Sequence, residues 1–175
     1  MKKLAGLIVG AMALLVVSAA PARAQVWASA AFTLQEWNSD PADSMGFALD
    51  FGGVIHKTSK TAGALYVDFS YNSFQDFDEN DLGFVGGFRE FFMVHKRVMP
   101  YVHVSTGLMR WSVPDFDISS NDWTIGFGAG VQFPITDMFG VKVQYDWWKP
   151  WEDGDWNGHI GRWSFGGTYT WGGGK

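Results

Sequence analysis

Cysteine is absent from this chain of 175 residues. Without cysteine the chain has no disulfide framework, and it lacks the residue that carries a bacterial lipoprotein anchor. After the first two dozen residues no run of about 20 apolar residues occurs, which excludes a membrane-spanning helix in the rest of the sequence. Basic residues are scarce, 13 Lys and Arg against 18 Asp and Glu. This acidic balance argues against a nucleic-acid partner, which needs a basic face.

The first 24 residues differ in composition from the rest. Two lysines precede the apolar run Leu4–Val17, and small residues follow it up to the segment Ala22–Ala24, which reads ARA. This is the organisation of a secretory signal peptide with a cleavage site. A retained membrane anchor is the alternative, but the run is short for a spanning helix. We expect residues 1–24 to be a signal peptide and residues 25–175 to form one domain, with ten basic and 18 acidic residues and a net charge of −8.

Strict alternation is clearest between Trp123 and Trp147. Every second residue from Ile125 to Phe133 is apolar or alanine, while the residues between them are small or polar. After a break at 134–140 the alternation resumes and continues to Trp147. Because successive side chains of a strand point to opposite faces, this segment predicts a hairpin with one apolar and one polar face.

The same period recurs along the whole chain. We predict eight strands, each near the about 9–11 residues that a tilted strand needs to cross a bilayer. The expected strands are Val26–Gln35, Met45–Val54, Ala64–Asn72, Leu82–Phe91, a fifth that follows Pro100, the two strands of the 123–147 hairpin, and Ile160–Trp171.

The connections fall into two classes that alternate along the chain. Those at 36–44, 72–81, 112–122 and 149–159 are acidic and long, whereas two of the other three, at 56–63 and 93–100, are basic and that at 134–140 is short. In transmembrane barrels the short turns lie in the periplasm and the longer loops outside. We therefore expect the acidic loops to be extracellular and both termini to be periplasmic.

Alternation alone leaves open which face points outward. A soluble, lipocalin-like barrel would hide the apolar face and expose the polar one, which would then be rich in Lys and Glu. Here the polar face is mostly Gly, Ser, Thr, Ala and Gln, and its six central charges balance, which suits a crowded interior. These predicted interior charges are Asp50, Asp68, Asp146, Arg89, Lys142 and Arg162. The sequence leaves their pairing open.

Tryptophans near strand ends support the membrane interpretation. We assign five to the acidic-loop ends and two to the opposite ends, which predicts two girdles at the water–lipid boundaries. The first group is Trp37, Trp111, Trp123, Trp147 and Trp148, and the second is Trp27 and Trp171.

The last predicted strand carries the most specific motif. Ser164, Gly166, Tyr169 and Trp171 follow the pattern polar-x-Gly-x-x-aromatic-x-aromatic, and four residues follow Trp171. With these features the chain resembles the small outer-membrane β-barrel family, the eight-stranded barrels typified by the OmpA transmembrane domain and OmpX. The resemblance covers residues 26–171. It implies an all-β, antiparallel, up-and-down transmembrane barrel, and it implies that the terminal strand is the signal read by the barrel-assembly machinery.

Two motifs are candidates for ligand binding. Gly126, Gly128 and Gly130 do not follow the spacing of a nucleotide-binding loop, and we interpret them as room for bulky inward neighbours. Residues 153–158, DGDWNG, match the first half of a calcium loop and make Asp153, Asp155 and Asn157 candidate ligands. The twelfth position is Ser164 where that loop has Glu, so a solvated turn is the alternative. A poorer version lies at Asp76, Asp78 and Asn80.

Enzymes that modify lipid A also occur among barrels of this size. They need a His, a Ser and a carboxylate near the outer rim. Resemblance to the lipid A deacylases would place His-x-Ser-Asn late in the seventh strand, where this chain has Gln144–Lys149, QYDWWK. His103 and Ser105 share a polar face, but in mid-barrel. His159 lies at the rim, and the serine nearest to it along the chain is Ser164.

The sequence therefore predicts a non-enzymatic outer-membrane protein of a Gram-negative-type envelope. We expect a structural or surface-interaction role and a monomer without cofactors, in contact with outer-membrane lipid, lipopolysaccharide and the barrel-assembly machinery. Eight strands leave an interior that side chains fill, which disfavours a wide pore. The alternatives are a barrel that binds or passes a small apolar ligand, and a lipid A-modifying enzyme.

Overall fold

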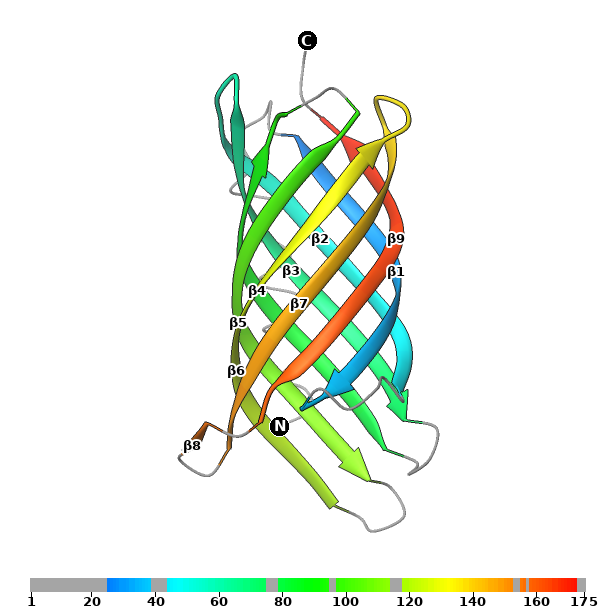
Figure 1. Ribbon diagram of the computed structural model, residues 1–175, viewed down its shortest axis with the longest axis vertical. Helices are drawn as coiled ribbons and strands as arrows, with labels where there is room; N and C mark the ends of the chain where they lie inside the picture. Colours follow the sequence, from blue (N-terminus) through cyan, green and yellow to red (C-terminus); the bar gives the residue numbers. More distant parts are fainter. Residues whose placement is uncertain are drawn as a thin grey trace.

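The computed structural model in Figure 1 describes residues 25–38, 44–74, 79–94, 97–113, 118–152, 155–156 and 158–172. Within these ranges eight long strands and one short strand form. They are β1 (Val26–Trp37), β2 (Ser44–Lys57), β3 (Thr61–Phe74), β4 (Asn80–Phe92), β5 (Met99–Val113), β6 (Ile118–Pro134), β7 (Phe139–Glu152), β8 (Asp155–Trp156) and β9 (Ile160–Trp171). The prediction of an all-β fold with eight spanning strands is confirmed. Residues 1–24, the predicted signal peptide, lie outside the described residues.

The eight long strands close into one barrel. Strands β1 to β7 pair in chain order, and β9 pairs with both β7 and β1, so that every long strand has two neighbours. The pairings are antiparallel, and β8 forms a small hairpin with the end of β7. Figure 1 shows the strands tilted around the barrel, with the start of β1 and the end of β9 at the same end. We call this end of the barrel the termini end, and the opposite end of the barrel the acidic-loop end. Among the described residues no helix is long and apolar enough to cross a membrane.

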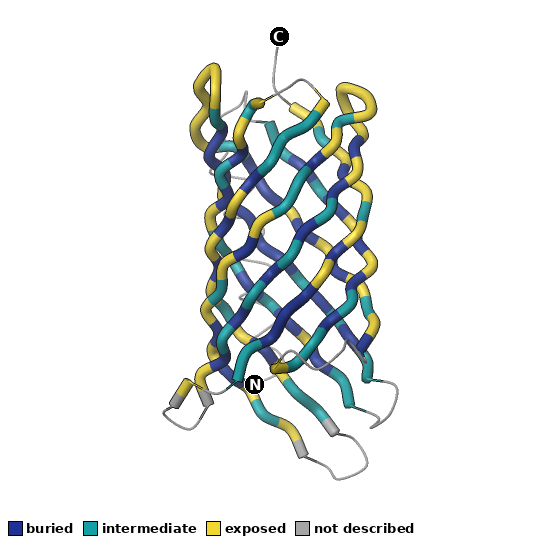
Figure 2. The backbone as a smooth tube through the Cα atoms, viewed as in Figure 1, coloured by how far each residue is buried: buried dark blue, intermediate teal, exposed yellow. Residues whose placement is uncertain are grey.

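The alternating sequence maps onto an outer and an inner face. Along each strand in Figure 2 buried residues alternate with more exposed ones. Phe127 on β6 and Phe165 on β9 are 58% and 43% exposed, while Arg162 and Lys142 are buried. Aromatic and branched side chains thus cover the outer wall, and the buried charged side chains lie in the interior. A soluble barrel would show the reverse, so the transmembrane interpretation is confirmed.

Several strands extend further than the apolar alternation predicts. Strand β6 begins at Ile118 and β7 continues through Pro150 to Glu152, so segments expected in acidic loops are strand. Strand β5 includes Pro100, near its start, where the missing N–H of proline is tolerated. Backbone pairing between strands continues beyond the bilayer, but lipid requires apolar outward side chains only along the part of each strand that lies within the bilayer. The sequence pattern therefore underestimates strand length at the acidic-loop end.

Two apolar clusters lie inside the barrel, one toward each end. The cluster at the termini end contains Trp27, Ala62, Ala64, Tyr66, Phe91 and Tyr101. The cluster toward the acidic-loop end contains Val85, Met109, Trp148 and Ile160, with Trp37 and Trp111 packed against it. Buried polar side chains occupy much of the remaining interior, and they form the candidate functional site.

Candidate functional site

All six predicted interior charges lie inside the barrel. Asp50, Asp68, Asp146, Arg89, Lys142 and Arg162 are each at most 3% exposed. They come from β2, β3, β4, β7 and β9, so only barrel closure brings them together. Three carboxylates face three cations, and the set is neutral. Charges buried at this depth need a partner, because removing an ion from water costs several kcal/mol.

Asp50 organises the part of this network nearest the termini end. Its carboxylate pairs with Lys142 Nζ, and Arg89 Nη1 lies 3.4 Å from Oδ1. Trp27 Nε1 donates a hydrogen bond of 2.7 Å to the same carboxylate, and the Ser29 hydroxyl donates another. Asp50 therefore receives donors from β1, β4 and β7 and ties one side of the barrel to the other.

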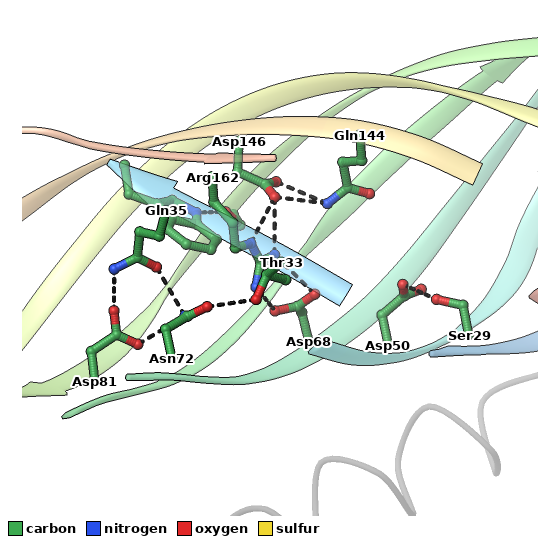
Figure 3. Close-up of polar contacts among 12 residues, drawn as sticks. Ser29, Thr33, Gln35, Asp50, Asp68, Asn72, Asp81, Gln144, Asp146 and Arg162 are labelled. Atoms are coloured by element: carbon green, nitrogen blue, oxygen red, sulfur yellow. Dashed lines mark hydrogen bonds and ion pairs between the residues drawn. The ribbon is translucent and has the colours of Figure 1, made fainter. Parts of the chain in front are cut away.

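Arg162 organises the middle of the network, as Figure 3 shows. Its Nη1 and Nη2 donate to the two oxygens of Asp68 at 3.0 and 3.1 Å, which is a bidentate pair. Its Nε and Nη2 also donate to Asp146 Oδ2, at 3.0 and 2.9 Å. The guanidinium lies over the indole of Trp148, 4.3 Å from the ring centroid. One arginine thus joins β3, β7 and β9.

Gln144 connects the two groups of charges. Its Oε1 accepts hydrogen bonds from Arg89 Nη2 at 3.2 Å and from the Tyr101 hydroxyl at 2.8 Å. Its Nε2 donates to both oxygens of Asp146 at 2.9 Å. The ion pairs therefore form one continuous network, which we call the polar network.

A second polar cluster near the acidic-loop end is absent from the sequence predictions. Asn72 Nδ2 donates to Gln35 Oε1 at 3.0 Å and to Asp81 Oδ1 at 3.1 Å, and Gln35 Nε2 donates to Asp81 (Figure 3). Thr33 donates to Asn72 Oδ1 at 2.5 Å. Strand parity places all four residues on the inner face. Asn72 ends the predicted strand Ala64–Asn72, and Asp81 falls within the predicted acidic connection 72–81, so neither was expected among the interior polar residues.

The three alternate glycines of β6 make room for large neighbours. A Cβ on Gly128 would lie 2.5 Å from His103 Nε2, and one on Gly130 would lie 2.5 Å from the Tyr101 hydroxyl. A Cβ on Gly126 would lie 2.8 Å from Trp148 Nε1. Over Gly128, His103 of β5 reaches Asp146 of β7, with 2.6 Å between Nε2 and Oδ1. The glycines therefore let rings from β5 and β7 fill the interior.

Large buried side chains occupy the interior between the described strands. Trp148, Arg89, Arg162 and Tyr101 are among the largest fully buried side chains, and all point into the barrel. An interior of eight strands is just wide enough to be filled in this way. The buried ion pairs join opposite strands of the barrel.

The histidine and the serine of the mid-barrel pair each contact other side chains. The side chain of His103 is wholly buried and its Nε2 faces Asp146. The Ser105 hydroxyl accepts a hydrogen bond of 3.2 Å from Trp148 Nε1. Each member of the pair is therefore engaged by another residue. At the rim, the ring of His159 lies over Trp147, and its backbone N–H donates to Asn38 Oδ1 at 2.9 Å.

Most of the calcium candidates lie outside the described residues. Asp153 and Asn157 do so, as do Asp76 and Asp78 of the second loop, while Asp155 begins β8. Asn80 accepts a hydrogen bond of 2.7 Å from the Tyr71 hydroxyl. No group of three or more metal-binding side chains occurs in the described part of the chain.

The residues of the predicted assembly signal lie on both faces of β9, two on the inner face and two on the outer wall. Ser164 is buried in the interior, and a Cβ on Gly166 would lie 2.6 Å from the backbone of Ala31. Tyr169 and Trp171 are exposed on the outer wall and stack on each other, with 5.6 Å between centroids. The strand thus offers an aromatic edge to lipid at the termini end.

The prediction of two tryptophan girdles is partly wrong. Trp27 and Trp148 are buried inside the barrel, and Trp37 and Trp111 pack against the inner cluster with 4.9 Å between their rings. Strand parity explains the difference, since all four stand on the inner face. Trp123 and Trp171 do lie exposed on the outer wall, at opposite ends of the barrel, and Trp151, Trp156 and Trp163 are also exposed.

A closed barrel of eight long strands with an apolar outer wall is a transmembrane β-barrel, because only a closed sheet satisfies its backbone within lipid. Its fold is that of the small outer-membrane β-barrels, which confirms the resemblance seen in the sequence and indicates the outer membrane as its location.

Several solved structures share this fold. Neisserial surface protein A has 19% sequence identity over 83% of this chain and 96% of that chain, with a TM-score of 0.60. Ail, the attachment invasion locus protein of Yersinia pestis, in complex with the heparin analogue sucrose octasulfate, has 16% identity over 85% and 99%, with a TM-score of 0.61. A major outer membrane protein from Thermus thermophilus has 11% identity over 85% and 99%, with a TM-score of 0.52. No protein-family model matches the sequence, and no curated protein matches it.

Proposed function

We propose that this chain is a non-enzymatic, monomeric outer-membrane protein with a structural or surface-interaction role. The observation that carries the proposal is the polar network, which fills the interior with ion pairs between opposite strands. An interior of this kind stabilises the barrel wall, which in turn supports the loops at the acidic-loop end. It offers no passage for a solute, and the mid-barrel histidine and serine are both engaged by other side chains.

The proposal includes a cleaved signal peptide, residues 1–24. It also includes recognition by the barrel-assembly machinery, which would read the motif Ser164, Gly166, Tyr169 and Trp171 at the end of the chain's last strand. In the membrane the outer wall contacts lipid and lipopolysaccharide. The acidic loops face outward and form the interaction surface. Ail, which shares the fold, was solved with a heparin analogue, and this supports a surface role by analogy.

The orientation of the barrel in the membrane can be tested with single introduced cysteines, because the chain has no cysteine of its own. Ser119 is exposed on β6 at the acidic-loop end, and Ser59 is exposed in the turn between β2 and β3 at the termini end. In intact cells, a membrane-impermeant maleimide is expected to label Ser119→Cys and not Ser59→Cys, and both after lysis. Labelling of Ser59→Cys alone in intact cells would reverse the orientation.

The absence of a pore is tested separately. Folded barrel, identified by its mobility shift between unboiled and boiled samples, is inserted into a planar bilayer. We expect no stable conductance steps. Regular steps that disappear in a sample boiled before insertion would contradict the proposed non-conducting role.

A further inference from the structure

A shallow groove crosses the outer wall of the barrel from β4 to β7. It follows one row of residues that pair across these four strands, namely Glu90, Val102, Ala129 and Tyr145. All four line a hollow of about 400 Å³. This volume is within the range of small-molecule sites, roughly 300–1,000 Å³.

A small side chain in the middle of the row makes the groove. Ala129 presents only a methyl group to the outside. The next row toward the acidic-loop end is bulkier and also lines the hollow, with Phe88, Val104 and Phe127 exposed on the outer wall. A hydrocarbon chain in the groove would therefore contact aromatic and branched side chains along its length.

The groove rises from the termini end toward the middle of the barrel. Pairing traced from Val26 through each neighbouring strand in turn returns to β1 at Glu36, ten residues nearer the acidic-loop end. Rows of pairs therefore climb toward that end from β1 round to β7, as tilted strands require. Three strand spacings of ~4.8 Å at a tilt of about 40° place Tyr145 roughly 9 Å higher than Glu90.

Glu90 places a carboxylate at the end of the groove nearest the termini end. It lies two residues before Phe92, where β4 ends, and it is half-buried on the outer wall. Among the described residues no hydrogen bond or ion pair engages its side chain. A charge on the lipid face is tolerated near the headgroups, where a cation can reach it.

Exposed cations lie beside this end of β4. Lys57 and Lys60 are exposed at the turn between β2 and β3. The Lys60 carbonyl accepts a hydrogen bond of 2.7 Å from the Met93 N–H, just beyond the end of β4. A carboxylate at the mouth of an apolar groove, with cations nearby, is complementary to a headgroup that carries both an ammonium and a phosphate.

We propose that the groove binds an aminophospholipid with a primary ammonium headgroup. One acyl chain lies along Val102 and Ala129, the ammonium donates hydrogen bonds to the Glu90 carboxylate, and the phosphate faces Lys60. A trimethylammonium headgroup has the same charge but no N–H, so it cannot donate these charge-assisted hydrogen bonds. The inference goes beyond the proposed function and rests on it only for the orientation that puts a phospholipid leaflet at the termini end.

The test is a lipid competition followed by native mass spectrometry of the folded barrel released from detergent micelles. Phosphatidylethanolamine and phosphatidylcholine with identical acyl chains are supplied in equal amounts. We expect the barrel to retain phosphatidylethanolamine in about two- to fivefold excess, the value of one exposed ion pair. Glu90→Gln should abolish the excess. Glu79→Gln is the matched control, because Glu79 precedes β4 at the acidic-loop end, and it should keep the excess.

A second pair of variants tests the groove itself. Ala129→Leu fills the hollow and should lower the retained phosphatidylethanolamine about threefold. Ala30→Leu makes the same change at an exposed position of β1, away from the groove, and should leave retention unchanged. The mobility shift between unboiled and boiled samples verifies that each variant is folded.

Three outcomes would overturn the proposal. The barrel could retain both lipids equally, as an ordinary lipid annulus does. Glu90→Gln could keep the excess, or Ala30→Leu could lower retention as much as Ala129→Leu. Because the lipids are supplied in detergent, none of these outcomes depends on the orientation of the barrel, which the cysteine labelling tests on its own.

Discussion

Replacing Arg162 by methionine tests the energetic role of the polar network. The side chain donates four hydrogen bonds of 2.9–3.1 Å, two to Asp68 and two to Asp146. Methionine keeps the length of the side chain but leaves two buried carboxylates without this cation. Removing one member of a buried pair costs about 3–5 kcal/mol. We expect a loss in the free energy of unfolding of that size.

The two carboxylates should differ in how far they restore stability. Asp68 receives its two hydrogen bonds from Arg162, whereas Asp146 also contacts Gln144 and His103. Adding Asp68→Asn to Arg162→Met removes the less supported charge, and it should recover more of the loss than adding Asp146→Asn. This non-additivity is what a double-mutant cycle measures.

The assay is reversible urea unfolding of the barrel in lipid vesicles, followed by tryptophan fluorescence and by the mobility shift of folded protein. Arg110→Met is the matched control, because this arginine is exposed on the outer wall, and its loss should cost less than Arg162→Met. The reasoning is refuted if Arg162→Met costs less than about 1 kcal/mol, the value of an exposed pair. It is also refuted if Asp68→Asn restores nothing.

Three further predictions concern the wall, the interior and the loops. Phe127→Arg should destabilise the barrel by about 2–4 kcal/mol, as for charge at mid-bilayer, and Gln132→Arg by less; equal unfolding energies would contradict the assigned faces. Gly128→Ala, whose Cβ meets His103, should cost roughly 1–3 kcal/mol, while Gly86→Ala, whose nearest contact is 3.6 Å, should be near neutral in the same urea assay. Calcium removal should leave protease cleavage within residues 153–158 unchanged if the loop is a solvated turn, and protection by the ion would show a calcium site.

The eight spanning strands were predictable from the sequence. Successive side chains of a strand point to opposite faces, and lipid requires one of those faces to be apolar, so apolar residues recur at every second position. The sequence also predicted the outward face, since the polar positions hold small residues and balanced charges that suit an interior. The same parity would have placed Trp27 and Trp148 inside. Their proximity to strand ends suggested girdles, but the direction of a side chain in a strand depends on parity and not on distance from the end.

The pairing of charges required the closed barrel. Asp68 and Arg162 are 94 residues apart and meet only because β3 and β9 curve around the same interior. Local pattern determines which face a residue occupies, while register determines which residue it meets.

The central claim is that alternate residues face lipid and a filled interior, and spin-label accessibility along β1 tests it most directly. Each residue from Ala28 to Leu34 is replaced in turn by cysteine and labelled in the bilayer, where Ser29, Ala31 and Thr33 are the buried members of the series. We predict high accessibility to oxygen, which partitions into lipid, at positions 28, 30, 32 and 34, and low accessibility at 29, 31 and 33. A profile of the opposite phase, or one without alternation, would contradict the account.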